Sequence, residues 1–248
     1  MSLAAAPRQP WLPQSRTRIK ICGLTREQDV DAACAAGADA IGFVLYPKSR
    51  RFVSAARAAE LARRLPPLVT PVLLFVNADA ASVAAACERL PGAIVQFHGD
   101  ESSAACLAME RQTGHAFWRA ARIPLDAQTP FDLLEFAHDF QAAQALLLDA
   151  QTEGYGGGGK TFDWSRLPTN VPAHLVLSGG LTPANVGQAI ARLRRCAWSL
   201  GVDVSSGVEA HGPDGQILKG TKSAGKIRQF VAAVRAADAQ FAEPQTPP

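Results

Sequence analysis

Short apolar runs alternate with Ala-rich segments along most of the chain. Few polar residues interrupt the apolar runs, which is typical of strands buried on both faces of a parallel sheet. The Ala-rich segments that follow them have the composition of helices that cover such a sheet. We therefore predict strands at residues 18–23, 38–46, 70–76, 93–98, 115–123, 144–150, 173–180 and 198–207.

A helix is expected after each strand, and several helices have recognisable first residues. Thr25 is a good N-cap with Gln28 in the capping-box position. Ser54 can cap the second helix, and Thr182 followed by Pro183 can start the seventh. The expected helices cover residues 25–37, 54–64, 79–90, a stretch from 100, 131–138, a short piece capped by Asp163, a stretch from 182, and 222–237.

Eight strand–helix units predict a single (β/α)8 TIM barrel, an α/β fold, at residues 17–240. A doubly wound open sheet is the structural alternative. Residues 1–16 and 241–248 are expected to be flexible extensions at the two ends of the chain. Residues 210–226 are rich in glycine and polar residues, and we expect a solvent loop there before the last helix.

Composition excludes several classes of function. The net charge of +3, from 25 basic and 22 acidic residues, is too small to indicate binding to nucleic acid or to an anionic membrane. Five Cys without zinc-type spacing fit a reduced cytoplasmic protein, not a disulfide framework or a metal site. There is no signal-peptide pattern and no apolar run of about 18 residues, so no membrane span is expected.

Polar residues at the strand ends are the candidate active-site residues, because catalytic groups of this fold lie at the carboxyl ends of its strands. These ends carry Cys22, the basic cluster that includes Arg51, His98 and Asp149. A Cys in an apolar run is more often a packing residue, and a strand-final Asp is often a helix cap. Across one barrel mouth, however, a thiolate can remove a proton from carbon and a carboxylic acid can protonate a leaving oxygen.

The turns after the seventh and eighth strands predict a phosphate site. Loops at these two positions commonly bind phosphate through backbone N–H groups in this fold. Gly179, Gly180 and Gly207 would let the backbone approach an anion closely. The alternative interpretation is that both are ordinary helix-entry turns.

Residues 154–161, GYGGGGKT, match the G-x-x-x-x-G-K-[ST] pattern of nucleotide-binding loops. Such a loop must lead into a helix of several turns, whereas Pro168 stops any helix here within about two turns. A P-loop nucleotide hydrolase is therefore a less favoured alternative. A non-catalytic phosphosugar-binding barrel, which would keep the phosphate turns, is another alternative. We favour a lid that closes over the bound ligand, formed by Gly156, Gly157, Gly158 and Gly159.

Eight short motifs follow one another along the chain. They are KICGLT (20–25), ADAIGFVLYPKSRR (38–51), FVN (75–77), VQFHG (95–99), LLLD (146–149), GGGGKTFDW (156–164), LSGGL (177–181) and VDVSSGVE (202–209). In order and spacing they resemble the phosphoribosylanthranilate isomerase family of tryptophan biosynthesis. The likeness covers about residues 17–237.

This resemblance implies a (β/α)8 barrel and an Amadori rearrangement of N-(5-phosphoribosyl)anthranilate to 1-(2-carboxyphenylamino)-1-deoxyribulose 5-phosphate. It makes Cys22 the general base and Asp149 the general acid. It implies no metal and no cofactor, because the iminium nitrogen of the substrate is the electron sink. A histidine-pathway phosphoribosyl isomerase is a related alternative, but such an enzyme is expected to carry Asp in place of Cys22.

The resemblance also implies contacts with a small phosphoribosyl substrate, and no obligate protein partner is evident. Arg51 would bind the anthranilate carboxylate through its fork of N–H groups. His98 would lie on the substrate side, and Asp203 would accept hydrogen bonds from sugar hydroxyls. Of the two arginines on the fifth strand, Arg119 and Arg122, one is expected to point to the barrel mouth. The implied phosphate contacts are Gly179, Gly180, Ser205, Ser206 and Gly207.

Overall fold

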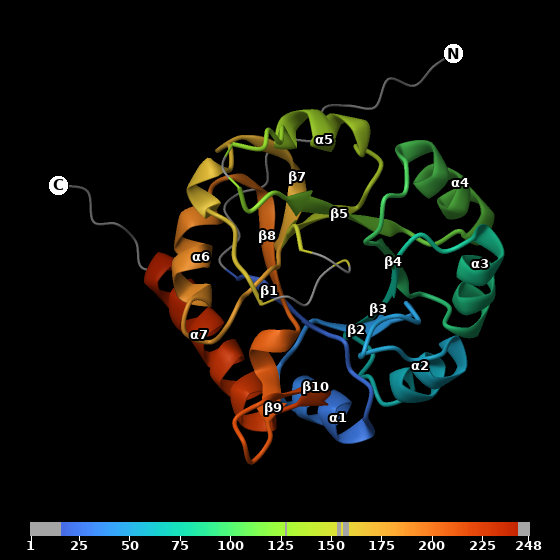
Figure 1. Cartoon of the computed structure of the whole chain (residues 1–248), viewed down its shortest axis with the longest axis horizontal. Coiled ribbons are helices and arrows are strands. Elements are labelled where there is room, and N and C mark those ends of the chain that lie inside the picture. The colour runs from blue at the N-terminus through green and yellow to red at the C-terminus, as the bar shows by residue number, and fades with distance from the viewer. Residues whose placement is uncertain (1–15, 127, 153–154, 156–158, 243–248) are drawn as a thin grey trace.

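The structure, a computed structural model, describes residues 16–126, 128–152, 155 and 159–242. Eight parallel strands form a closed barrel in chain order, and helices surround the ring of strands (Figure 1). The predicted single (β/α)8 barrel is confirmed. A doubly wound sheet is wrong, because β1 pairs with β8 and closes the ring. The predicted terminal extensions and Gly156, Gly157 and Gly158 of the predicted lid lie outside the described residues, apart from a few residues next to the barrel.

The barrel strands are β1 (Arg18–Cys22), β2 (Ala40–Val44), β3 (Thr70–Phe75), β4 (Ile94–Phe97), β5 (Phe117–Ile123), β6 (Ala145–Ala150), β7 (Val171–Leu177) and β8 (Ala197–Val204). The helices between and after them are α1 (Glu27–Ala36), α2 (Ala55–Ala62), α3 (Ala80–Arg89), α4 (Ser103–Thr113), α5 (Leu133–Asp139), α6 (Val186–Leu193) and α7 (Ala224–Ala242). Two short 3-10 helices, η1 (Trp164–Arg166) and η2 (Ser206–Val208), follow β6 and β8.

Side chains alternate between the two faces of each strand, as strand geometry requires. In β1, Ile19 and Ile21 join the large apolar core. Lys20 and Cys22 therefore face the inside of the barrel, where Cys22 packs against Val44 of β2. The barrel interior near the carboxyl ends thus carries most of the polar strand residues beside a small apolar cluster, and the layer between strands and helices carries most of the apolar ones.

Several predicted helix boundaries are confirmed by their caps. The Ser54 side chain accepts a hydrogen bond from the Arg57 N–H at 3.1 Å, and Asp163 caps η1 through the Ser165 N–H at 2.9 Å. The fourth helix begins a little later than expected, after Ser102, whose hydroxyl caps it.

Two predicted caps are wrong. α1 begins after Arg26, and the Thr25 hydroxyl instead donates to the Gly220 carbonyl at 2.8 Å, so a distant segment binds the group that would cap the helix. α6 begins after Asn185, because the Thr182 N–H donates to the Asn185 side chain at 2.8 Å and holds a turn before the helix.

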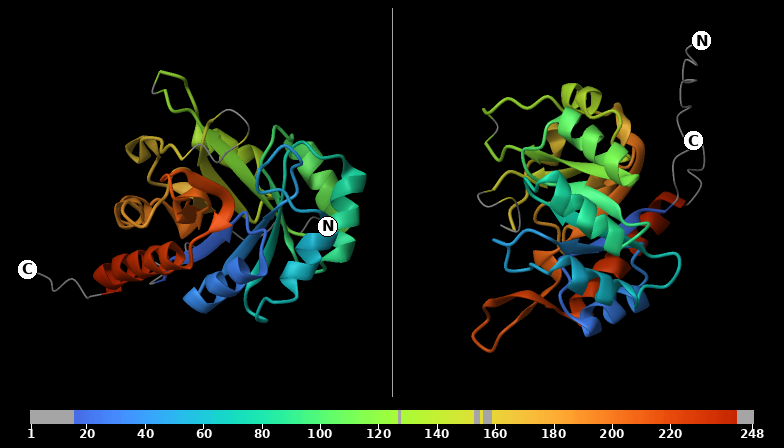
Figure 2. Two further views of the ribbon diagram at one scale, coloured as in Figure 1. Left: turned by 60° about the horizontal axis from the view of Figure 1, so that its bottom comes forward. Right: turned by 90° about the vertical axis from the view of Figure 1, so that its right-hand side faces the viewer.

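The expected loop at 210–226 is wrong in its secondary structure, although most of the segment is exposed as expected. β9 (Glu209–His211) and β10 (Ile217–Lys222) form an antiparallel ribbon beside α1, which Figures 1 and 2 show. Gly220 and Lys222 of this ribbon are buried. The Gly220 carbonyl accepts from the Thr25 hydroxyl, and the Lys222 N–H donates to the Asp29 carboxylate of α1, so the ribbon is bound to the α1 side of the barrel mouth. Residues 213–219 of the segment are exposed, as expected, whereas Gly220 and Lys222 toward its end are buried and bind partners on α1 and the turn before it.

None of the helices in the described part of the chain is long and apolar enough to cross a membrane. Among the same residues, no group of three or more His, Cys, Asp or Glu side chains is placed to hold a metal ion.

The two ends of the described chain meet at Asp238 on α7. Its carboxylate accepts hydrogen bonds from the Thr17 N–H and hydroxyl just before β1, at 3.0 and 2.7 Å. It also forms ion pairs with Arg194 and Arg235. Because β1 closes the barrel against β8, this carboxylate fastens the last helix to the closing strand.

We expect Asp238→Ala to lower the free energy of unfolding by about 3 kcal/mol, because it removes the carboxylate that the buried Thr17 N–H and the nearly buried Arg194 side chain share. Urea unfolding followed by circular dichroism measures the change. Asp31→Ala, which removes an exposed ion pair with Arg64, is the matched control and should cost much less. Equal losses in the two variants would contradict a special role for Asp238.

Candidate active site

A cavity of about 270 Å³ opens at the carboxyl ends of the strands. Its lining gathers residues from β1, β2, β3, β6 and β8, from the loops after β2, β3, β4, β6, β7 and β8, and from β10. Gly207, predicted as a phosphate contact, does not line the cavity. The other predicted site residues within the described chain do: Cys22, Arg51, His98, Asp149, Gly159, Gly179, Gly180, Asp203, Ser205 and Ser206.

Cys22 is the last residue of β1 and is 4% exposed. Its register partner on β2 is Gly42, and a Cβ atom added there would lie 2.7 Å from the Cys22 Sγ. Glycine at this position therefore leaves the space that the thiol occupies. Burial raises the pKa of the Cys22 thiol, and the charge of neighbouring Lys20 opposes that rise.

Asp149 lies near the end of β6 and is held on both carboxylate oxygens. Oδ1 accepts from the Ala150 N–H at 3.0 Å, and Oδ2 lies 3.0 Å from Nε2 of His98. Nδ1 of His98 lies 3.0 Å from Nε2 of Gln96, which is fully buried. Both ring nitrogens of His98 thus have protein partners, and the imidazole contacts the candidate acid.

Gly179 is needed beside this carboxylate. It has φ +78°, and a Cβ there would lie 2.6 Å from the Ala150 nitrogen and 2.9 Å from the Asp149 Oδ1. A side chain would therefore be strained in its backbone and would displace the acid.

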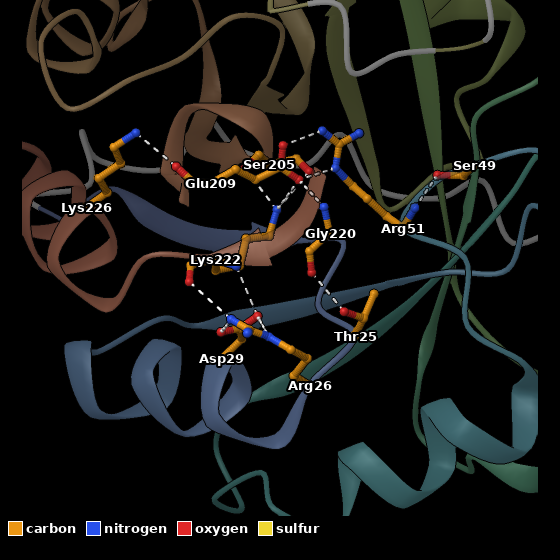
Figure 3. A network of polar contacts seen from close by, with 10 residues as sticks. All are labelled: Thr25, Arg26, Asp29, Ser49, Arg51, Ser205, Glu209, Gly220, Lys222 and Lys226. Carbon is orange, nitrogen blue, oxygen red and sulfur yellow. Dashed lines mark hydrogen bonds and ion pairs between the residues drawn. The ribbon is translucent and has the colours of Figure 1, made fainter. Parts of the chain in front are cut away.

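Arg51 extends over the end of β1 and pairs with Glu209 of β9 (Figure 3). Its Nε and Nη2 donate to the two carboxylate oxygens at 2.7 and 2.9 Å, a bidentate pair. A Cβ on Gly23 would lie 2.5 Å from the Arg51 Cδ, so the absence of a side chain at Gly23 leaves room for the Arg51 side chain. Within the described chain no acceptor binds Nη1, so one edge of the guanidinium is available at the cavity.

Lys222 connects this pair to the turn after β8, as Figure 3 shows. Its Nζ donates to the Ser205 carbonyl at 2.9 Å and hydroxyl at 3.2 Å, and lies 3.4 Å from Glu209 Oε1. Burial lowers the pKa of Lys222 to about 8, with the Arg51 charge adding to this effect and Glu209 opposing it. One buried carboxylate thus holds both the arginine and the lysine that supports the predicted phosphate turn.

Two loops form the predicted phosphate side of the cavity. Gly180 has φ +64°, and a Cβ there would lie 2.7 Å from the Lys160 carbonyl oxygen. A Cβ on Gly207 would lie 1.9 Å from the Leu181 carbonyl oxygen. Gly180 and Gly207 therefore allow neighbouring loops to pack closely. Ser205 and Ser206, in the turn after β8, line the cavity.

An apolar wall faces the phosphate side and was not found from the sequence. Cys22, Val44, Leu74 and Val76 form a small cluster inside the barrel. The rings of Tyr46 and Tyr155 pack against it, with centroids 6.2 Å apart and planes at 80°. Inward apolar residues of a strand look the same in sequence as outward ones, so no signal marked this wall.

The two arginines of β5 separate as expected. Arg122 lies on the inward face toward the mouth, pairs with Asp100 at 3.1 Å, and stacks 4.5 Å from the Tyr155 ring. Arg119 faces the helix layer, where it donates to the Phe97 carbonyl at 3.1 Å. Neither arginine lines the cavity.

Sequence reasoning also missed four polar residues that hold the site. Gln96, Glu209, Lys222 and Lys20 are buried behind the residues that face the cavity. A charged or amide group in an apolar strand was a usable signal for Lys20 and Gln96, because such groups are rarely buried without a partner.

Comparisons with known proteins agree with one another. The family model described as N-(5'-phosphoribosyl)anthranilate (PRA) isomerase matches residues 19–233. An N-(5'-phosphoribosyl)anthranilate isomerase from Leptothrix cholodnii is 57% identical, with 92% of this chain and 96% of the relative covered.

Solved structures give the same result. The crystal structure of phosphoribosyl anthranilate isomerase from Thermotoga maritima is 36% identical, with a TM-score of 0.75 over 89% of this chain and 99% of that one. A phosphoribosyl anthranilate isomerase in complex with reduced 1-(o-carboxyphenylamino)-1-deoxyribulose 5-phosphate is 32% identical, with a TM-score of 0.68 and the same coverage. The chain therefore belongs to the N-(5'-phosphoribosyl)anthranilate isomerase family of enzymes.

Proposed function

We propose that this chain isomerises N-(5'-phosphoribosyl)anthranilate in tryptophan biosynthesis, with Cys22 as general base and Asp149 as general acid. The observation that carries the assignment is that a thiol on β1 and a carboxyl group on β6 line one cavity. The same cavity has a glycine-rich turn for a phosphate and an available arginine edge for a carboxylate. Five free cysteines in the described chain support a cytoplasmic location.

The chemistry needs one acid and one base in sequence. Asp149 gives its proton to the furanose ring oxygen, and the ring opens to a protonated imine. The Cys22 thiolate then takes the proton from sugar C2, and the C2–H electrons form the enolamine while neutralising the iminium nitrogen. Tautomerisation of the enolamine gives the ketone, so no external electron acceptor is required.

His98 fits the role of a partner of Asp149 better than that of a substrate contact. If the Gln96 amide donates to Nδ1, the Nε2–H donates to an ionised Asp149. If the amide is turned, Nδ1–H donates to the Gln96 oxygen, and Nε2 accepts from a protonated Asp149. The buried chain of hydrogen bonds can therefore accommodate both protonation states that a general acid passes through.

We expect the substrate to bind with its carboxylate and its phosphate at opposite ends of the cavity. The Nη1 edge of Arg51 takes the carboxylate, and the anthranilate ring packs on the apolar wall of Val44, Leu74 and Val76. The phosphate lies at the turns after β7 and β8, and Asp203 accepts from sugar hydroxyls between them. Exposed cationic side chains at the mouth favour entry of such a polyanion: Lys48, Arg50, Lys160 and Lys219.

The other functions considered are less well supported. The described residues after GYGGGGKT contain only the three-residue η1 before β7, and a nucleotide-binding loop requires a longer helix. A non-catalytic phosphosugar barrel would not need Cys22 and Asp149 in one cavity. The histidine-pathway alternative is disfavoured by a thiol at the position where those enzymes are expected to carry Asp.

We expect Cys22→Ala and Asp149→Asn each to lower kcat by about a thousandfold, because each removes a proton-transfer group. The fall in phosphoribosylanthranilate fluorescence measures turnover, and calorimetry with the reduced product analogue measures binding, which should change little. Cys87→Ala, a buried cysteine on α3, is the matched control. Wild-type turnover in either site variant would refute that assignment.

We expect Arg51→Lys to raise KM for phosphoribosylanthranilate by about tenfold or more. A lysine ammonium cannot form bidentate hydrogen bonds to Glu209 and to a substrate carboxylate at the same time. The measurement is repeated with N-(5-phosphoribosyl)aniline, which lacks the carboxylate and should show little change. Arg50→Lys, at the exposed neighbouring position, is the control. Equal changes for the two substrates would count against the carboxylate contact.

A further inference from the structure

A buried lysine lies beside the candidate base. Lys20 is 2% exposed and shares the inward face of β1 with Cys22. Lysine side chains are rarely buried, because taking an ammonium out of water is costly unless it is paired. Its Nζ lies 2.9 Å from Oδ1 of Asp203, its register partner on β8. The Ser178 hydroxyl donates to the other oxygen of that carboxylate at 3.1 Å.

The ammonium of Lys20 also shares a space with the thiol. A Cβ added to Gly42 would lie 2.7 Å from the Cys22 Sγ and 3.0 Å from the Lys20 Nζ. Both atoms therefore border the same small volume above Gly42, and they lie within a few ångströms of each other. In such a buried place a positive charge interacts strongly with a negative one.

We propose that Lys20 is a positioning residue of the isomerase reaction, whose ammonium, held by Asp203, stabilises the Cys22 thiolate directly across the space above Gly42. The mechanistic part of this proposal rests on Cys22 being the base. The electrostatic part concerns only the thiol and can be measured without turnover.

Of the charged groups among the described residues, three have the largest effect on the thiol. Lys20 comes from the same strand, Asp203 from β8 and Lys222 from β10. Burial raises the pKa of the Cys22 thiol, and Asp203 raises it further, whereas Lys20 and Lys222 lower it. The Arg51 guanidinium nearby is already paired with Glu209. Lys20 is thus the leading favourable influence on the thiolate.

The ion pair with Asp203 favours the charged form of Lys20. Burial alone would lower its pKa, but Asp203 and Cys22 together hold that pKa above its ordinary value. The ammonium therefore does not compete for the proton at sugar C2. When Cys22 takes that proton and becomes neutral, Asp203 still pairs with the ammonium, so the lysine remains in place for the next turnover.

The test follows alkylation of Cys22 by iodoacetamide as a function of pH, read by peptide mass mapping that separates it from the other cysteines. Lys20→Gln should move the midpoint of Cys22 alkylation upward by about one pH unit or more, since loss of a close opposite charge has that effect. The amount of thiolate below the midpoint then falls about tenfold. Lys20→Arg should keep most of the wild-type midpoint. Lys219→Gln, an exposed lysine at the same cavity, should leave the midpoint within a few tenths of a unit.

The double variant Lys20→Gln/Asp203→Asn separates a direct effect from an indirect one. It replaces the ion pair with a neutral pair, so folding does not depend on a buried unpaired charge. A midpoint that stays above that of wild type supports direct stabilisation of the thiolate. A midpoint at or below that of wild type in the double variant, or no shift in Lys20→Gln, overturns the proposal.

Kinetics show whether this electrostatic effect reaches the reaction. The acidic limb of the kcat/KM profile should move with the alkylation midpoint in Lys20→Gln, and Lys20→Arg should restore it. A shifted alkylation midpoint with an unshifted limb overturns the catalytic part of the proposal. If Cys22→Ala retains turnover, the base assignment fails, and the alkylation result still stands on its own.

Discussion

The pairing of β1 with β8 is the constraint on which the rest of the molecule depends. It closes the barrel, and it brings residues from the two ends of the chain opposite each other in register, with Lys20 facing Asp203. A few residues earlier, Thr17 is bound by Asp238 of the last helix. Because a closed parallel barrel directs alternate side chains inward, this closure also decides which polar groups share the interior with Cys22.

Two buried charge clusters then organise the cavity. One is the Lys20–Asp203 pair beneath the thiol, and the other is Glu209 with Arg51 and Lys222. Buried charges are costly alone and tolerable when paired and hydrogen-bonded, which is the condition of every member of these clusters. Fixed partners leave the side chains little freedom to reorganise. The site is therefore preorganised, and the ligand that we propose for it carries a carboxylate at one end and a phosphate at the other.

The sequence alone predicted the barrel and most candidate site residues because each depends on local pattern. Apolar runs mark the strands, and Cys22, Asp149 and Gly179 stand at strand ends, where position predicts exposure to the cavity. What failed depends on contacts between distant segments. The Thr25 hydroxyl is bound by Gly220 and does not cap α1, and the ribbon at 209–222 supplies Glu209 and Lys222 to the site. Which face of a strand points inward, as for Lys20 or Leu74, is fixed only by the register of the closed barrel.

The proposed mechanism requires one cavity to position the base, the acid and both anionic ends of the substrate at once. A crystal structure of this chain with reduced 1-(o-carboxyphenylamino)-1-deoxyribulose 5-phosphate tests it most directly. We expect sugar C2 within about 3.5 Å of the Cys22 sulfur. We also expect the carboxylate on the free edge of Arg51 and the phosphate at Gly179, Gly180 and Ser206. A ligand bound in the reverse direction, or with C2 remote from Cys22, would contradict the proposed mechanism.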